Sequence, residues 1–265
     1  MADLLSLQQR AAQGEKLAIL TGYDASFAAQ LEACGVDAIL VGDSLGMVIQ
    51  GQRSTLPVSL TEMAYHTAAV ARGATKTLII ADLPFGSYQA SPAQALQSAS
   101  TLLAAGAHCV KIEGGAVMME TVAFLSTRGI PVCGHLGLLP QSVNSLGGYK
   151  VQGKTESAAQ QLLDDAHALT AAGAAMIVLE AIPAPLAKQV TDAITIPTIG
   201  IGAGVDCNGQ VLVLYDMLGI TPGKPPRFTH NFMADTNDIA AAIAAYVTAV
   251  KQGTFPTEKH SFYTT

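Results

Sequence analysis

Acidic side chains recur along this sequence where short apolar runs end. Asp43 follows the second run and Asp82 follows the third. Glu180 follows the sixth run, and the fourth run carries Lys111 and Glu113, which share one face of a strand because they are two residues apart. Carboxylates that meet at one site repel each other unless a cation or a shared proton relieves them. Oxygen ligands without paired His or Cys favour a hard cation, with Mg²⁺ the first candidate.

Each of these polar residues also has a structural interpretation. Asp24 ends the first run and Ser44 lies just after the second, and residues of these types commonly cap the following helix. Lys111 could pair with Glu113 for structural reasons alone. His135 follows the fifth run, where it is either a hydrogen-bonded histidine at a strand end or a contact for substrate.

Eight apolar runs of strand length would position these side chains. They cover residues 17–21, 38–42, 77–81, 109–112, 131–134, 175–179, 197–201 and 211–214. Ala-rich amphipathic stretches such as 60–72, 92–105 and 156–172 alternate with them, and a Gly follows most of these stretches as a stop signal, for example Gly73 and Gly106.

Runs that are apolar throughout indicate strands buried on both faces, as in a parallel sheet covered by helices. The pattern predicts an α/β protein, a single-domain (β/α)8 barrel over residues 1–265, with its active site at the C-terminal ends of the strands. A doubly wound open sheet is the alternative. Two long non-periodic stretches, 138–154 and 219–232, are expected to be functional or to face a partner.

Composition narrows the class of protein. Of 265 residues, 50% are hydrophobic and 13% are charged, which predicts a globular chain. The net charge of −6 and the lack of a basic cluster argue against nucleic acid as a partner. Four scattered cysteines suggest neither disulfides nor a zinc site, and no apolar run reaches the ~18 residues of a membrane span. We therefore expect a cytoplasmic protein that has no membrane partner.

Two glycine patterns suggest nucleotide binding but lack its context. Gly148, Gly153, Lys154 and Thr155 match a phosphate-binding loop, yet no strand comes directly before them. The glycines of 200–204 are spaced G-x-G-x-G, without the last glycine of the dinucleotide fingerprint, and a tight turn after the seventh strand explains them.

Short motifs in a fixed order along nearly the whole chain resemble the ketopantoate hydroxymethyltransferase family. They are Thr21-Gly-Tyr-Asp24, Val41-Gly-Asp-Ser-Leu-Gly46, Tyr65-His-Thr67, Ala81-Asp-Leu-Pro84, Val110-Lys-Ile-Glu-Gly114, Pro131-Val-Cys-Gly-His-Leu-Gly137, Pro140-Gln-Ser142, Gly147-Gly-Tyr-Lys-Val-Gln-Gly153, Leu179-Glu180, Gly200-Ile-Gly-Ala-Gly204 and His260-Ser-Phe262. Gly22, Tyr215 and the segment 205–208 differ from forms typical of the family, and none of these lies at a metal or base position.

The resemblance implies an enzyme of pantothenate biosynthesis that moves a one-carbon unit from 5,10-methylenetetrahydrofolate to 3-methyl-2-oxobutanoate. The product would be 2-dehydropantoate, formed through a Mg²⁺-stabilised enolate. A Mg²⁺-dependent carbon–carbon lyase or mutase acting on another 2-oxo acid is the alternative. The resemblance also implies a homo-oligomer, commonly a decamer, in which an apolar C-terminal helix at 238–251 would take part.

The same resemblance assigns roles to the strand-end residues. Asp43, Asp82 and Glu113 would hold Mg²⁺, and Glu180 would be the catalytic base. The residues expected to bind substrate are Asp43, Ser44, Asp82, Lys111 and His135.

Overall fold

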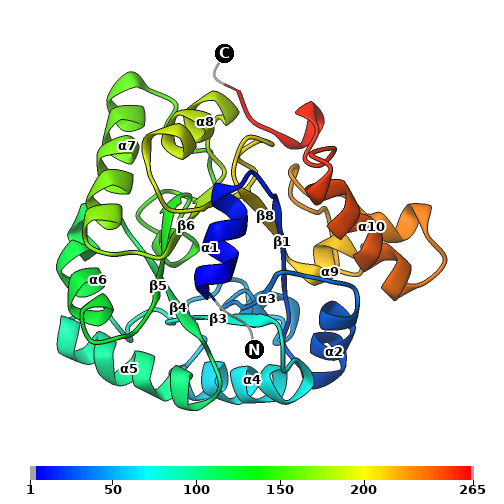
Figure 1. Cartoon of the computed structure of the whole chain (residues 1–265), viewed down its shortest axis with the longest axis horizontal. Helices are drawn as coiled ribbons and strands as arrows, with labels where there is room; N and C mark the ends of the chain where they lie inside the picture. Colours follow the sequence, from blue (N-terminus) through cyan, green and yellow to red (C-terminus); the bar gives the residue numbers. More distant parts are fainter. Residues whose placement is uncertain (1–3, 264–265) are drawn as a thin grey trace.

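Eight parallel strands pair in chain order and close into a barrel, since the first strand pairs with the eighth (Figure 1). The structure is a computed structural model that describes residues 4–263, so residues 1–3 and 264–265 of the predicted domain lie outside the described residues. The strands are β1 (Leu17–Thr21), β2 (Ala38–Val41), β3 (Leu78–Asp82), β4 (Cys109–Glu113), β5 (Val132–Gly137), β6 (Met176–Glu180), β7 (Thr198–Ile201) and β8 (Gly209–Leu212). The predicted (β/α)8 barrel is confirmed, and the open sheet is wrong.

Most helices surround the barrel on its outer side, whereas α1 lies over one of its ends (Figure 1). The longer ones are α1 (Leu4–Ala12), α2 (Ala25–Ala33), α4 (Leu60–Gly73), α5 (Pro92–Ala104), α6 (Met119–Ser126), α7 (Glu156–Ala171), α8 (Ala184–Ala193) and α10 (Ile239–Lys251). The short ones are α3 (Leu45–Val48), α9 (Leu214–Met217), η1 (Ala116–Met118), η2 (Pro140–Ser142), η3 (Phe232–Asp235) and η4 (Glu258–His260). No helix within residues 4–263 is long and apolar enough to cross a membrane.

The apolar runs form strands because both faces of each strand are covered. Almost every strand residue is buried, which is the environment of a parallel sheet between a packed interior and an outer helical layer. The predicted eighth strand began two residues late, because Gly209 and Gln210 already pair with β1 and β7, whereas Leu214 starts α9. The buried Gln210 side chain donates to the carbonyl of Gly204, which explains how a polar residue lies within this strand.

The glycine signals have two different structural causes. Gly106 follows α5 with φ +112°, as a helix stop requires, and Gly202 and Gly204 turn the chain after β7 with φ +65° and +83°. Gly73 was expected to follow α4 but is its last residue. A Cβ on Gly73 would lie 2.1 Å from the carbonyl oxygen of Ala25, so the close approach of α2 and α4 requires the glycine.

Charged residues close the N-terminal end of the barrel. Helix α1 lies there, with Gln8 Nε2 donating to the carbonyl of Ala175 at 2.7 Å. The buried Asp37 carboxylate before β2 pairs with Arg10 of α1 and with Lys251 of α10, the latter at 2.9 Å. Arg10 also donates to Glu15, and this hydrogen bond is the main reason that the pKa of Glu15 is lowered to about 2.

We expect Glu15→Gln to remove a contribution to stability that is present at neutral pH and is lost at acid pH. A carboxyl with a lowered folded-state pKa stabilises the fold above its ordinary value of 4.5 and loses that effect as the pH falls toward about 2. The free energy of unfolding should therefore be lower in the variant at about pH 6, and the difference should shrink at about pH 3, in urea titrations. A difference that does not change with pH would contradict the assignment. The effect is modest, because the Glu15 side chain is 40% exposed.

Candidate active site

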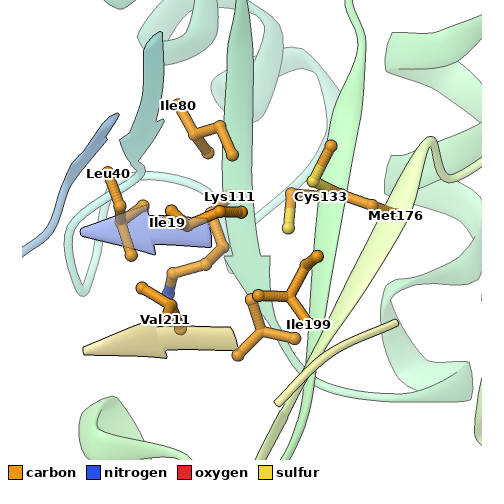
Figure 2. Close-up of a pocket in the computed structure, with 9 residues that line it drawn as sticks. Ile19, Leu40, Ile80, Lys111, Cys133, Met176, Ile199 and Val211 are labelled. Atoms are coloured by element: carbon orange, nitrogen blue, oxygen red, sulfur yellow. The ribbon is translucent and has the colours of Figure 1, made fainter. Parts of the chain in front are cut away.

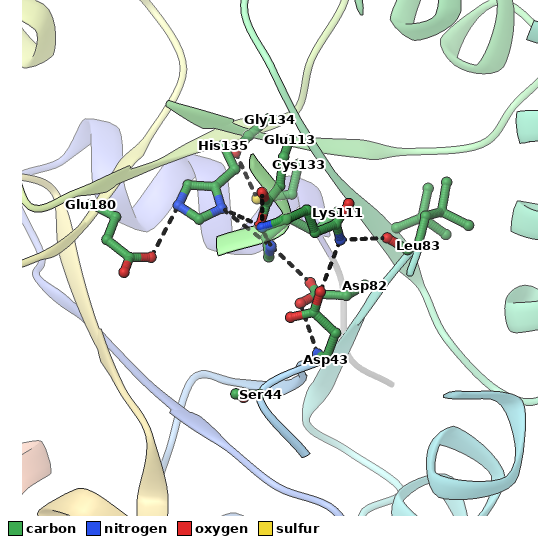
Figure 3. Close-up of polar contacts among 12 residues, drawn as sticks. Asp43, Ser44, Asp82, Leu83, Lys111, Glu113, Cys133, Gly134, His135 and Glu180 are labelled. Carbon is green, nitrogen blue, oxygen red and sulfur yellow. Dashed lines mark hydrogen bonds and ion pairs between the residues drawn. The ribbon is translucent and has the colours of Figure 1, made fainter. Parts of the chain in front are cut away.

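The barrel brings the predicted site residues together at the C-terminal ends of β2 to β6 (Figure 3). Asp82, Glu113 and Glu180 are the last residues of β3, β4 and β6, and each is held by the register of its strand. Asp43 and Ser44 follow β2, Lys111 lies within β4 and His135 within β5. Strand pairing sets Asp82 beside Lys111, Glu113 beside His135, and Gly137 beside Glu180. The expected convergence is thus a direct result of closing the barrel.

Lys111 is the central cation of this cluster. Its Nζ lies 3.1 Å from Oδ1 of Asp82, 3.8 Å from Oε1 of Glu113 and 3.3 Å from Nδ1 of His135. Burial alone would lower the pKa of Lys111, but the charges of Asp82, Glu113 and Asp43 outweigh it and raise the pKa above its usual value. Lys111 is therefore a permanent positive charge inside the barrel.

Asp43 and Asp82 form an adjacent acidic pair. The backbone N–H of Asp43 donates to Oδ2 of Asp82 at 3.0 Å, and both side chains are buried. Burial raises the pKa of both carboxyls, and the charge of Asp82 raises that of Asp43 further. One lysine does not fully compensate these charges, so the pair is suited to a further cation or to a proton.

His135 lies between two glutamates. Its Nδ1 is 3.4 Å from Oε1 of Glu113, and its Nε2 is 3.2 Å from Oε2 of Glu180. Burial and the charge of Lys111 lower the pKa of His135, but its contacts with Glu113 and Glu180 outweigh them and raise it to about 9. Burial opposes the ionisation of Glu113, yet His135 and Lys111 lower its pKa below the usual value. His135 therefore links Glu113 to Glu180 electrostatically, and its expected contact with substrate stays a prediction.

Ser44 is held by a tyrosine and does not cap a helix. It stands at the N-terminus of α3 without a side-chain capping bond, and its Oγ lies 2.9 Å from the hydroxyl of the buried Tyr23. The capping interpretation is wrong for Ser44 and correct for Asp24, which accepts from the N–H of Phe27 at 2.9 Å. The Ser44 hydroxyl is thereby kept at the end of β2, beside the acidic pair.

Two residues of the cluster were missing from the predicted site. Gln141, in the long loop expected to be functional, donates from its side chain to Asp43 at 2.9 Å and from its backbone to Glu113 at 3.0 Å. Tyr88 accepts from the N–H of Glu113 at 3.0 Å. The motif Pro140-Gln-Ser142 was the only signal in the sequence for Gln141, and no signal pointed to Tyr88.

Two of the acidic residues have oxygens that could bind a hard cation such as Mg²⁺. Oδ1 of Asp82 and Oε1 of Glu113 are buried and make no hydrogen bond of good geometry, although Lys111 lies near both. Free carboxylate oxygens are the donors that Mg²⁺ prefers. Across residues 4–263, however, no three His, Cys, Asp or Glu side chains are already gathered as a metal site. The residues thus fit a cation whose remaining ligands are water and substrate oxygens.

The interior of the barrel next to Lys111 is apolar (Figure 2). Lys111 lines a cavity of about 10 Å³ there. Its other lining residues are Ile19, Leu40, Ile80, Cys133, Met176, Val178, Ile199 and Val211. A space of this size would hold at most one water, which would find few polar partners there. The low polarity of this lining strengthens the attraction between Lys111 and the nearby Asp82 and Glu113.

Glycine at position 137 is required by the approach of β5 to β6. Gly137 has φ +92°, and a Cβ there would lie 2.2 Å from the carbonyl oxygen of Glu180. That carbonyl accepts from the N–H of Leu138 at 2.8 Å. The closeness of the two chains fixes the backbone from which the Glu180 side chain projects.

We expect Gly137→Ala to impair activity more than binding of Mg²⁺. The added methyl group must push the backbone of Glu180 away, and a displacement of about 1 Å at a reacting group can reduce the rate by about 100-fold. Steady-state kinetics beside calorimetric titration of Mg²⁺ would measure the two effects. Gly129→Ala is a suitable control, because it also has a positive φ but has open space around its Cβ position. Equal losses of activity in both variants would contradict the explanation.

Barrels of this architecture carry their catalytic residues at the C-terminal strand ends. This chain places its buried, strongly perturbed ionisable groups at the same ends, and such groups mark active sites. The protein is therefore a (β/α)8-barrel enzyme.

Comparison with known proteins identifies the family. Residues 2–258 match the family described as ketopantoate hydroxymethyltransferase. The 3-methyl-2-oxobutanoate hydroxymethyltransferase of Thiobacillus denitrificans is 63% identical over 99% of this chain and 98% of its own length. The protein of the same name from Neisseria meningitidis is 58% identical over 99% of both chains. The chain belongs to the ketopantoate hydroxymethyltransferase family, as the sequence motifs predicted.

Solved structures with similar folds are more distant in sequence. A phosphonopyruvate hydrolase in complex with oxalate and Mg²⁺ has a TM-score of 0.63 and 13% identity, covering 98% of this chain and 93% of its own. A 2,3-dimethylmalate lyase has a TM-score of 0.58 and 18% identity over 83% of both chains. At this identity the likeness concerns the fold alone.

Proposed function

We propose that this enzyme transfers a hydroxymethyl group from 5,10-methylenetetrahydrofolate to 3-methyl-2-oxobutanoate, forming 2-dehydropantoate for pantothenate biosynthesis. The observation that carries the proposal is the position of the buried Lys111 cation among Asp82, Glu113 and His135, with Glu180 next to them. Glu180 is more accessible than these neighbours, with 14% of its side chain exposed. Family membership supports the same reaction.

Lys111 would bind and polarise the oxo acid. The hydrogen on C3 is too weakly acidic for a carboxylate to remove unless negative charge on the adjacent oxygen is stabilised. An ammonium group held in place in a site of low polarity can stabilise that charge, because no solvent has to reorganise around it. Ser44, held by Tyr23, would donate or accept a hydrogen bond at the same end of β2.

Asp43, Asp82 and Glu113 would hold Mg²⁺, which when bound would act as a Lewis acid toward the oxygens of the oxo acid. The oxygens of Asp82 and Glu113 that make no hydrogen bond support this assignment. With these acids engaged by cations, Glu180 remains available for proton transfer.

Glu180 would take the proton from C3, and His135 would keep the carboxylate oriented during the transfer. The electron pair left on C3 then forms the new bond to the methylene carbon of the donor. That carbon has two bonds to folate nitrogens: one breaks as the donor opens to an iminium before the attack, and the other breaks when a water molecule supplies the hydroxyl oxygen. The remaining proton of that water and the proton held by Glu180 pass to the two nitrogens, and tetrahydrofolate leaves. Polar groups that hold the base in one orientation contribute to such a step by positioning it.

Proton NMR in D₂O tests the proposal in two stages. The purified protein, Mg²⁺ and 3-methyl-2-oxobutanoate should lose the C3 proton signal without folate, and adding methylenetetrahydrofolate should produce the hydroxymethylated acid. Exchange without transfer would contradict the assignment of methylenetetrahydrofolate as the donor. If Mg²⁺ binds but neither exchange nor product is observed, the proposed reaction is contradicted and the lyase or mutase alternative is favoured. The homo-oligomer and the cytoplasmic location stay predictions.

A further inference from the structure

Gln141 connects the long loop between β5 and α7 to the acids of the site. The buried side chain uses all of its hydrogen-bonding capacity. Nε2 donates to the carbonyl of Leu83 and to Oδ2 of Asp43, both at 2.9 Å. Oε1 accepts from the hydroxyl of Tyr88 at 2.8 Å and from Nε2 of Gln89 at 3.2 Å. A backbone carbonyl and a carboxylate can only accept, so the amide has one possible orientation.

Tyr88 fixes that orientation from the other side. Its hydroxyl accepts from the N–H of Glu113 at 3.0 Å and donates to Gln141. The backbone N–H of Gln141 in turn donates to Oε2 of Glu113 at 3.0 Å. A closed ring of hydrogen bonds therefore joins Glu113, Tyr88 and Gln141, and the Gln141 side chain extends it to Asp43.

These hydrogen bonds and one more occupy one oxygen of each of the three acids. Oδ2 of Asp43 and Oε2 of Glu113 are both occupied by Gln141, and Oδ2 of Asp82 is occupied by the N–H of Asp43. Oδ1 of Asp82 and Oε1 of Glu113 make no hydrogen bond and face the ammonium group of Lys111, at 3.1 and 3.8 Å. Gln141 thus contacts the acids from β2 and β4 at once, although it belongs to neither strand.

We propose that Gln141, oriented by Tyr88, is a positioning residue that turns one oxygen of Asp43 and one of Glu113 toward the bound cation and substrate. A neutral amide is suited to this role, because it donates to an acid without adding a fourth negative charge. The inference rests on the proposed function of these acids. It goes further in making the loop 138–154 part of the site through one side chain and one backbone N–H.

Calorimetric titration of the metal-free protein with Mg²⁺ tests the inference without requiring turnover. Gln141→Met keeps the length of the side chain but removes its hydrogen bonds. Loss of a group that orients a metal ligand typically weakens metal binding by about 10–100-fold, and we expect a loss in this range. Tyr88→Phe, which leaves the amide in place without its hydroxyl partner, should weaken binding in the same direction by a smaller factor.

Matched variants separate positioning from stability. Gln210→Met removes another buried glutamine, and Tyr246→Phe removes a buried hydroxyl bonded to the carbonyls of Ile19 and Gln210. Both controls should lower Tm and leave Mg²⁺ affinity unchanged. Unchanged Mg²⁺ affinity in Gln141→Met would overturn the inference, and if that variant does not fold, the same result in Tyr88→Phe would overturn it.

The wild-type protein distinguishes this inference from the proposed function. If Mg²⁺ binding depends on Gln141 but the wild type does not transfer a hydroxymethyl group, the positioning role is supported and the proposed function is contradicted. If the wild type transfers the group and the variants bind Mg²⁺ as tightly as the wild type, the proposed function is supported and the positioning role is contradicted. If the wild type binds no Mg²⁺, both the metal assignment and the positioning role are wrong.

Discussion

Glu180→Gln should bind Mg²⁺ and the oxo acid about as well as the wild type but should lose exchange of the C3 proton. The amide has the same size and fits beside Nε2 of His135, which lies 3.2 Å from Glu180. It cannot act as a base at neutral pH. Removing a general base reduces a rate by roughly 100- to 10,000-fold, and both exchange and transfer should fall by this amount.

Proton NMR in D₂O measures the exchange directly, and calorimetry checks that Mg²⁺ still binds. Glu120→Gln is a matched control, since Glu120 is exposed in the first turn of α6, and it should exchange at the wild-type rate. Full exchange by Glu180→Gln would exclude Glu180 as the base.

Lys111→Met should reduce both activity and stability. Without the ammonium group, the acids around it lose the positive charge that lies 3.1 Å from Asp82. Removing one partner of a buried ion pair costs about 3–5 kcal/mol of unfolding free energy. Losing a fixed group that stabilises developing negative charge reduces kcat by roughly 100- to 1,000-fold.

The stability loss in Lys111→Met should depend on pH in a defined direction. Buried carboxyls without a cation have folded-state pKa values above their ordinary ones, so they stabilise the fold at low pH and lose that effect as the pH rises. Urea unfolding should therefore show a larger difference from the wild type at about pH 8 than at about pH 5. Lys188→Met, which removes an exposed lysine paired with Asp192, should change neither property. A loss of stability that is the same at both pH values would contradict this account.

The fold was predictable because its signals are local and repeated. Uniformly apolar runs such as 175–179, followed by helical stretches, specify strands that are buried on both faces. The acids at the strand ends were predictable for the same reason, since a barrel brings the C-terminal ends of its strands together whatever the loops do. The eighth strand was misplaced because Gln210 is polar, and only its contact with Gly204 makes its burial possible.

The details of the site depend on contacts between distant segments. Gln141 reaches Asp43 across 98 residues and Tyr88 across 53, and no periodic pattern encodes such a pair. The double contact of His135 with Glu113 and Glu180 likewise depends on how three strands are set beside one another. Ser44 has the residue type of a helix cap, and only the nearby hydroxyl of Tyr23 shows that it has another partner.

Closure of the barrel between β1 and β8 has a consequence for how the protein is made. Leu17 of β1 pairs with Gly209, so one edge of the first strand has no partner until most of the chain has left the ribosome. At the usual speed of synthesis this interval is about 10–40 s. During that time the apolar strand Leu17–Thr21 has an open edge, which other nascent chains can join. Slower growth at low temperature, or a chaperone that covers this edge, should therefore raise the yield of native protein in a heterologous host, without any change to the sequence.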